Sequence, residues 1–73
     1  MILIQGGNMA TEVLKDRGYR IIGYLETSLD GKKVLKNSQY RILGYYNPHT
    51  NVTTDAAYKI VGYGNLLMTL INR

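Results

Sequence analysis

Tyr40-Arg41-Ile42-Leu43-Gly44-Tyr45 is the central copy of a pattern that this chain of 73 residues contains three times. The other two copies are Tyr19-Arg20-Ile21-Ile22-Gly23-Tyr24 and Tyr58-Lys59-Ile60-Val61-Gly62-Tyr63. A pattern repeated with its internal positions fixed indicates one supersecondary unit, which is too small to bury its own apolar face. Neighbouring copies must therefore complete a common core.

The residues before each copy identify the unit as a β-hairpin. Each copy follows a valine, two further residues and an Asp or Asn, with the acidic or amide side chains at Asp16, Asn37 and Asp55. A side-chain oxygen there can accept a hydrogen bond from the backbone two residues on, which favours a turn. The hexamer is rich in Tyr, Ile and Val, as return strands are. We therefore expect an all-β antiparallel meander of three hairpins, at about 13–26, 34–47 and 52–64.

The connections between hairpins differ in their turn chemistry. Asp30-Gly31 predicts a tight turn with φ > 0 at both central residues, so that residues 24–28 pair with residues 32–36. Residues 47–51, Asn-Pro-His-Thr-Asn, predict a looser loop, because proline cannot donate to a ladder. The three hairpins are then one domain, residues 9–73.

The two ends of the chain lie outside the repeat. Residues 1–8 form an extension in which Gly6-Gly7 interrupts any regular element. Either residues 2–4 add an edge strand, or Met9 is the natural start; the second interpretation is preferred. In the segment 65–72, Asn65 can cap a helix of about two turns whose stripe is Leu66, Leu67, Leu70 and Ile71. A last strand over residues 66–71 is the alternative.

The recurrent glycines, Gly23, Gly44 and Gly62, indicate a bulge or a close approach of backbones. Simple alternation places Tyr19, Ile21 and Gly23 on one face, and Arg20, Ile22 and Tyr24 on the other. Each face then carries an aliphatic and an aromatic residue. Such hairpins are expected to be partly buried on both sides, as in an assembly.

Size and composition favour self-association. A domain of this length buries only about 60% of its unfolded surface, so it needs disulfides, a metal or oligomerisation. The chain has no cysteine, one histidine and five carboxylates, so neither a disulfide nor a metal site is expected. A homo-oligomer is the remaining solution, with Leu66, Leu67, Leu70 and Ile71 as its candidate interface.

The repeats resemble a known family. Residues 40–51 leading into 58–67, and above all Gly44-Tyr45-Tyr46-Asn47-Pro48 together with residues 62–67, are similar to the four-fold β-flower proteins, small bacterial proteins. The resemblance covers residues 13–71. It implies β-hairpin petals and no enzymatic activity. Turns of that family often carry Gly where this chain has Tyr19, Tyr40 and Tyr58.

No catalytic constellation is found in the sequence. Acid–base and nucleophilic catalysis need paired groups, whereas His49 lies alone in a predicted loop, and no glycine spacing matches a phosphate loop. We therefore expect a non-enzymatic structural or protein-interaction module without cofactors or metal. No stretch reaches the length of a membrane span, and residues 1–4 lack the basic start of a secretory signal, so the predicted location is cytoplasmic.

The alternative function is single-stranded nucleic-acid binding. The formal net charge is +4, and a cation recurs four residues before a tyrosine: Arg20 with Tyr24, Arg41 with Tyr45, and Lys59 with Tyr63. A cation on the phosphate backbone and a ring beneath a base hold single strands without sequence preference. The structural interpretation is preferred, because Tyr packs well in sheets and Arg stems cover apolar surface.

Overall fold

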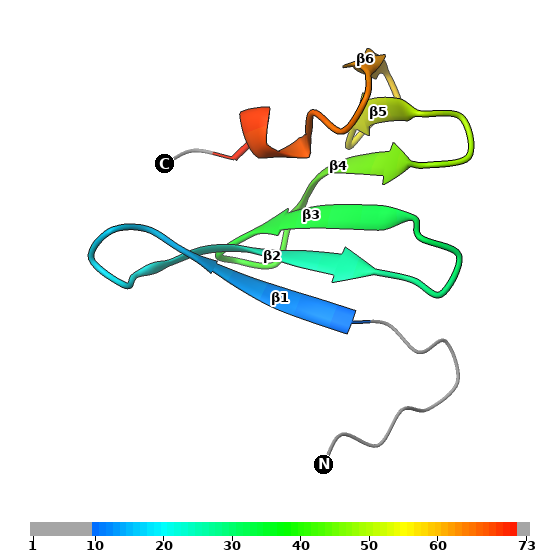
Figure 1. The fold of residues 1–73 in the computed structure, drawn as a ribbon. Helices are drawn as coiled ribbons and strands as arrows, with labels where there is room; N and C mark the ends of the chain where they lie inside the picture. Colours follow the sequence, from blue (N-terminus) through cyan, green and yellow to red (C-terminus); the bar gives the residue numbers. More distant parts are fainter. Residues whose placement is uncertain (1–9, 72–73) are drawn as a thin grey trace.

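Residues 10–71, which the computed structural model describes, form one six-stranded antiparallel sheet (Figure 1). Its strands are β1 (Ala10–Lys15), β2 (Ile21–Thr27), β3 (Lys33–Asn37), β4 (Ile42–Asn47), β5 (Val52–Asp55) and β6 (Ile60–Tyr63). Their order in the sheet is their order in the chain, so the predicted meander of three hairpins is confirmed, including the pairing of β2 with β3. The predictions for residues 1–8 and Met9 lie outside the described residues.

The three repeats share one turn, which is built by Asp16, Asn37 and Asp55. In the first, the Asp16 N–H donates to Arg20 O and the Tyr19 N–H donates to Asp16 O, both at 3.0 Å. In all three, the side-chain Oδ1 accepts the backbone N–H groups two and four residues on, at 2.8 to 3.0 Å. The predicted side-chain-to-backbone turn is therefore confirmed in each copy.

The last residue of each of these turns has a left-handed backbone, and it is a tyrosine. Tyr19, Tyr40 and Tyr58 have φ values of 63°, 68° and 66°. Three-residue hairpin loops commonly end in this conformation, but usually on glycine, because a side chain there is crowded. The chain thus places a large aromatic ring at a position that ordinarily carries no side chain.

The β2–β3 connection is the same loop with its usual residue. The Ser28 N–H donates to Lys32 O and the Gly31 N–H donates to Ser28 O, so residues 29–31 form a three-residue loop inside the closing pair Ser28 and Lys32. Only Gly31 has a positive φ there, at 92°. The expected two-residue turn with φ > 0 at Asp30 as well is wrong. Asp30 instead accepts the Ser28 hydroxyl and the Lys32 N–H, which fixes the longer loop.

Each return strand carries a bulge immediately before its glycine. In the first hairpin Lys15 pairs with Ile21 but Leu14 pairs with Gly23, so Ile22 has no partner of its own. The same shift leaves Leu43 and Val61 unpaired in the other hairpins. The predicted bulge is confirmed, and it overturns the simple alternation of faces. Ile22 packs against the core on the same face as Gly23, whose position is covered by Ile71.

The C-terminal segment lies across this face (Figure 1). It places one side chain over each repeat. A Cβ at Gly23 would lie 2.5 Å from Ile71 Cδ1, a Cβ at Gly44 2.5 Å from Leu70 Cδ1, and a Cβ at Gly62 2.7 Å from Leu66 Cδ1. The recurrent glycines therefore serve close approach as well as the bulge. Leu35, Leu67 and Ile71 are the buried hydrophobic residues of the core.

The expected two-turn helix is instead a single 3-10 turn, Leu67–Thr69 (η1). Asn65 Oδ1 does accept the Leu67 N–H, as a cap would, at 3.2 Å. The Leu66 N–H is bound by Thr53 Oγ1 at 3.0 Å, which ties the segment to β5. A regular helix would keep its leucines on one stripe, whereas Leu66, Leu70 and Ile71 reach three different hairpins. Tertiary contacts thus override the local pattern.

The close fit at Gly44 yields a prediction. Gly44→Ala is expected to lower the free energy of unfolding by about 1 to 3 kcal/mol, the usual cost of overpacking. The added Cβ would meet Thr54 O at 2.6 Å, and a backbone atom in a ladder cannot move aside. Urea denaturation followed by circular dichroism measures the change.

Gly18→Ala is the matched control. Its Cβ would lie 3.5 Å from Asp16 Oδ1, an ordinary contact, and Gly18 does not have a positive φ. Unfolding of this variant should occur at the wild-type denaturant concentration or slightly above it. Equal midpoints for Gly44→Ala and the wild type would contradict the packing described for the glycines.

Candidate functional site

The face of the sheet opposite the C-terminal segment carries two aromatic pairs. We call Tyr24, Tyr40, Tyr45 and Tyr58 the tyrosine face. Tyr24 and Tyr45 follow the repeat glycines on β2 and β4, whereas Tyr40 and Tyr58 are the left-handed residues of the second and third repeat turns. The left-handed backbone directs each turn ring back onto the preceding hairpin.

The first pair joins Tyr24 and Tyr40. Their ring centroids lie 4.8 Å apart with an interplanar angle of 69°, an edge-to-face contact. The Tyr40 hydroxyl donates to Glu26 Oε2 at 3.2 Å, and Lys36 Nζ lies 4.4 Å from the Tyr40 ring centroid. Lys36 Nζ also pairs with Glu26 Oε1 at 3.1 Å, with both side chains mostly buried. Tyr40 thus covers a cross-strand ion pair.

The second pair joins Tyr45 and Tyr58. Their rings are stacked, with centroids 4.6 Å apart and planes 7° from parallel. The Tyr58 side chain raises the pKa of Tyr45, first by hydrogen bonding to its neutral hydroxyl and then by partial desolvation. The raised pKa keeps Tyr45 a neutral phenol at neutral pH, so Tyr45 offers no activated phenolate for chemistry.

The two pairs follow one rule. The tyrosine after the glycine of one hairpin contacts the turn tyrosine of the next hairpin: Tyr24 with Tyr40, and Tyr45 with Tyr58. Tyr19 precedes the first pair and Tyr63 follows the second. Among residues 10–71 neither has an aromatic partner, and they are 82% and 74% exposed. The series of pairs is open at both ends.

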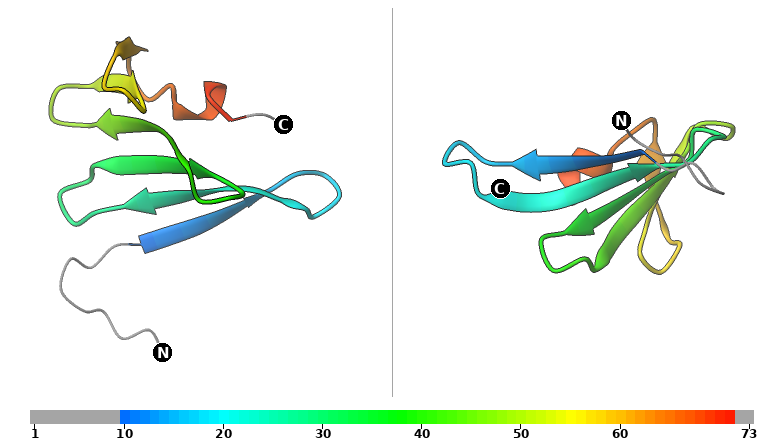
Figure 2. Two further views of the ribbon diagram at one scale, coloured as in Figure 1. Left: turned by 180° about the vertical axis from the view of Figure 1, so that it is seen from behind. Right: turned by 90° about the horizontal axis from the view of Figure 1, so that it is seen from below.

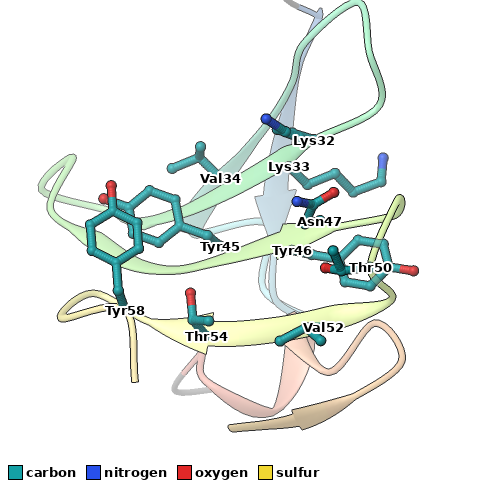
Figure 3. A pocket seen from close by; sticks show the side chains of 10 residues that line it. All are labelled: Lys32, Lys33, Val34, Tyr45, Tyr46, Asn47, Thr50, Val52, Thr54 and Tyr58. Carbon is teal, nitrogen blue, oxygen red and sulfur yellow. The ribbon is translucent and has the colours of Figure 1, made fainter. Parts of the chain in front are cut away.

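A shallow groove of about 390 Å³ runs beside the second pair (Figure 3). It is lined by Lys32, Lys33, Val34, Tyr45, Tyr46, Asn47, Thr50, Val52, Thr54 and Tyr58. Several of the polar side chains around it already have partners. Lys32 Nζ lies 3.7 Å from Asp30 Oδ2, Lys33 Nζ donates to Thr27 Oγ1, and the Tyr46 hydroxyl donates to Asn51. The groove therefore presents mainly aromatic and aliphatic surface.

Asp16 and Asp30 stabilise turns. The Arg20 backbone N–H, bonded to the carboxylate, is the main cause that lowers the pKa of Asp16, and the Ser28 hydroxyl lowers the pKa of Asp30 in the same way. His49 is exposed in the loop after β4, and its Nε2 lies 3.1 Å from Asp30 O. Within residues 10–71 no three side chains of the metal-ligating types gather.

The cation–tyrosine pairs suggested by the sequence do not form contacts within the described residues. Arg20, Arg41 and Lys59 are exposed at the positions that close the turns. The tyrosines expected beside them are engaged elsewhere: Tyr24 and Tyr45 are half-buried against turn tyrosines, and only Tyr63 is free. The single cation–π contact found in residues 10–71 uses Lys36 instead.

Sequence reasoning missed the turn tyrosines and the Glu26–Lys36 pair. A signal for the tyrosines was present, because a bulky residue recurred at a hairpin position where glycine or asparagine is usual. A bulky residue in a left-handed conformation is expected to make a side-chain contact that offsets its unfavourable backbone. The candidate interface residues Leu66, Leu67, Leu70 and Ile71 cover this chain's own sheet, with Leu67 and Ile71 buried.

Comparisons with family models, curated proteins and solved structures give no match. The resemblance to the four-fold β-flower proteins therefore stays a prediction. Among the described residues, no helix has the length and apolar character needed to cross a membrane.

The stacked pair can be tested by a double-mutant cycle. Tyr45→Ala and Tyr58→Ala should show an interaction energy of about 0.5 to 1.5 kcal/mol in unfolding free energy, because each substitution removes the same ring contact. Chemical denaturation of the wild type, both single variants and the double variant measures it.

The matched control combines Tyr24→Ala with Tyr58→Ala. Tyr24 contacts Tyr40 rather than Tyr58, so these two effects should add to within about 0.5 kcal/mol. Additive effects in the Tyr45–Tyr58 cycle as well would show that the stacking contributes nothing.

Proposed function

We propose that this protein is a non-enzymatic structural module that assembles as a homo-oligomer through its sheet. The proposal rests on the number of buried hydrophobic side chains compared with the number of exposed ones. Three hydrophobic side chains are buried, whereas eleven large ones are exposed among residues 10–71. A domain with so small a core gains stability chiefly by covering further surface.

Four of the exposed residues lie on the two edge strands, where an assembly would cover them. Val13 is on the edge strand β1, and Ile60, Val61 and Tyr63 are on the edge strand β6. Figure 2 shows the strands fanning apart as the sheet twists, with the two edge strands at its opposite ends. An edge strand presents backbone N–H and C=O groups that favour pairing with another chain. Within residues 10–71, both edge strands of the sheet therefore combine exposed apolar side chains with unpaired backbone groups.

Single-stranded nucleic-acid binding is the alternative proposal. The exposed Arg20, Arg41 and Lys59 support it, since cations that project from the turns could contact phosphates. The engagement of Tyr24 and Tyr45 within the sheet counts against it, because a ring that is already packed offers less surface to a base. We therefore retain self-assembly as the function.

Light scattering coupled to size exclusion tests the proposal. The wild type at micromolar concentration should have a mass that is a multiple of the 8.3 kDa chain. A stable, folded monomer at that concentration would rule the proposal out.

An oligonucleotide titration tests the alternative on the same sample. Self-assembly alone predicts no binding of a single strand at low salt. Nucleic-acid binding predicts an affinity that falls with ionic strength, with a log–log slope of about −0.7 for each phosphate contacted. Arg41→Gln should then make the slope shallower and leave the assembly mass unchanged.

A further inference from the structure

We propose that the copies join head to tail, with β6 of one copy pairing with β1 of the next and Tyr63 contacting Tyr19 across the junction. This inference rests on the proposed function, because it specifies the interface of the oligomer. The chain already makes the corresponding contacts twice between its own hairpins.

The first internal template is the strand register. Between the first and second hairpins Gly23 pairs with Asn37, and between the second and third Gly44 pairs with Asp55. Each repeat glycine thus lies opposite the turn Asp or Asn of the hairpin that follows. The third glycine, Gly62, lies on an edge strand, and the first such Asp, Asp16, adjoins the other edge strand. Continuing the register pairs Gly62 with Asp16 of the next copy and Tyr63 with Lys15.

The second template is burial at equivalent repeat positions. Val34 and Val52 are half-buried beside the preceding hairpin, whereas Val13, which has no preceding hairpin, is 46% exposed. Ile22 and Leu43 pack against the core, whereas the equivalent Val61 is 41% exposed. Within the described residues, β1 lacks the neighbour that β3 and β5 have, and β6 lacks the neighbour that β2 and β4 have. Each edge strand therefore lacks the kind of neighbouring strand that the other edge strand would supply.

The third template is the tyrosine face. Two of the turn tyrosines contact the post-glycine tyrosine of the preceding hairpin. Tyr19 holds the same left-handed backbone, at φ 63°, without such a partner in the described residues, and Tyr63 is the post-glycine tyrosine that lacks a turn tyrosine. Placing β6 beside β1 of a second copy would bring these two rings together as a third pair.

The complementarity of the edges selects a second copy as the occupant. A contact between two different surfaces of the same chain is heterologous, so it generates a closed ring or an open chain rather than a symmetric pair. Residues 1–9 and an unrelated protein are the alternative occupants of an edge. These other occupants are outcomes of the experiment below.

The experiment blocks each end separately. Tyr19→Asp and Tyr63→Asp both replace an exposed side chain, and Asp tolerates the left-handed backbone at position 19. Each variant alone should have the mass of one chain by light scattering, because one of its two ends is blocked. An equimolar mixture should form a species of two chains, since the intact Tyr63 end of the first variant fits the intact Tyr19 end of the second.

Arg17→Asp is the control, because it introduces the same carboxylate into the same exposed turn, with an even larger change in net charge, but lies outside the proposed pair. It should keep the wild-type mass. A monomeric wild type would overturn the proposed function. An oligomeric wild type whose mass survives both tyrosine substitutions, or variants that stay monomeric on mixing, would overturn the head-to-tail interface alone.

Disulfide trapping provides a second measurement that does not depend on blocked ends. The chain has no cysteine, so Lys15→Cys and Tyr63→Cys chains can be mixed and oxidised without competition from native thiols. Directly paired residues on antiparallel strands have Cα atoms about 4.5 to 5.5 Å apart, within reach of a disulfide. The mixed dimer should form in preference to a dimer of Ser38→Cys with Tyr63→Cys. Equal yields would contradict the register.

Discussion

The left-handed backbone at the three turn tyrosines is the constraint on which the rest of the structure depends. For a residue with a side chain, this conformation costs about 1 to 2 kcal/mol. At Tyr40 the cost is offset by the edge contact with Tyr24, about 0.5 to 1.5 kcal/mol, and by Lys36 over the ring. At Tyr58 the stacked Tyr45 takes that role. The turn therefore links each hairpin to its predecessor, which a glycine could not do.

A bulge that follows each of these turns shapes the core on the opposite face. In the first hairpin the bulge leaves Ile22 unpaired, so that Ile22 and Gly23 face the same side. The glycine then leaves space for an aliphatic side chain from the C-terminal segment, as Ile71 shows. Each repeat thus places a tyrosine ring on one face of the sheet and a glycine, which has no side chain, on the other. The proposed assembly uses the tyrosine, and the core uses the space beside the glycine.

Much of this arrangement could be predicted from sequence, because it is local. The hairpins, the Asp or Asn turns and the bulged glycine each follow from a few adjacent residues. The faces could not be predicted, because alternation holds only where the register is regular, and the bulge at Ile22 breaks it. The aromatic pairs depend on how separate hairpins align, and the shape of residues 66–71 depends on which glycine each side chain reaches. Both are decided by tertiary contacts.

The most direct test of this account is the backbone conformation of Tyr40 in solution, measured by nuclear magnetic resonance. A positive φ brings the amide proton and Hα of one residue close together, so Tyr40 should show a strong intraresidue amide–Hα Overhauser effect. Cross-peaks between the Tyr40 and Tyr24 ring protons should accompany it. A weak intraresidue effect with a strong sequential one, as in an extended strand, would contradict the claim that a left-handed tyrosine links the hairpins.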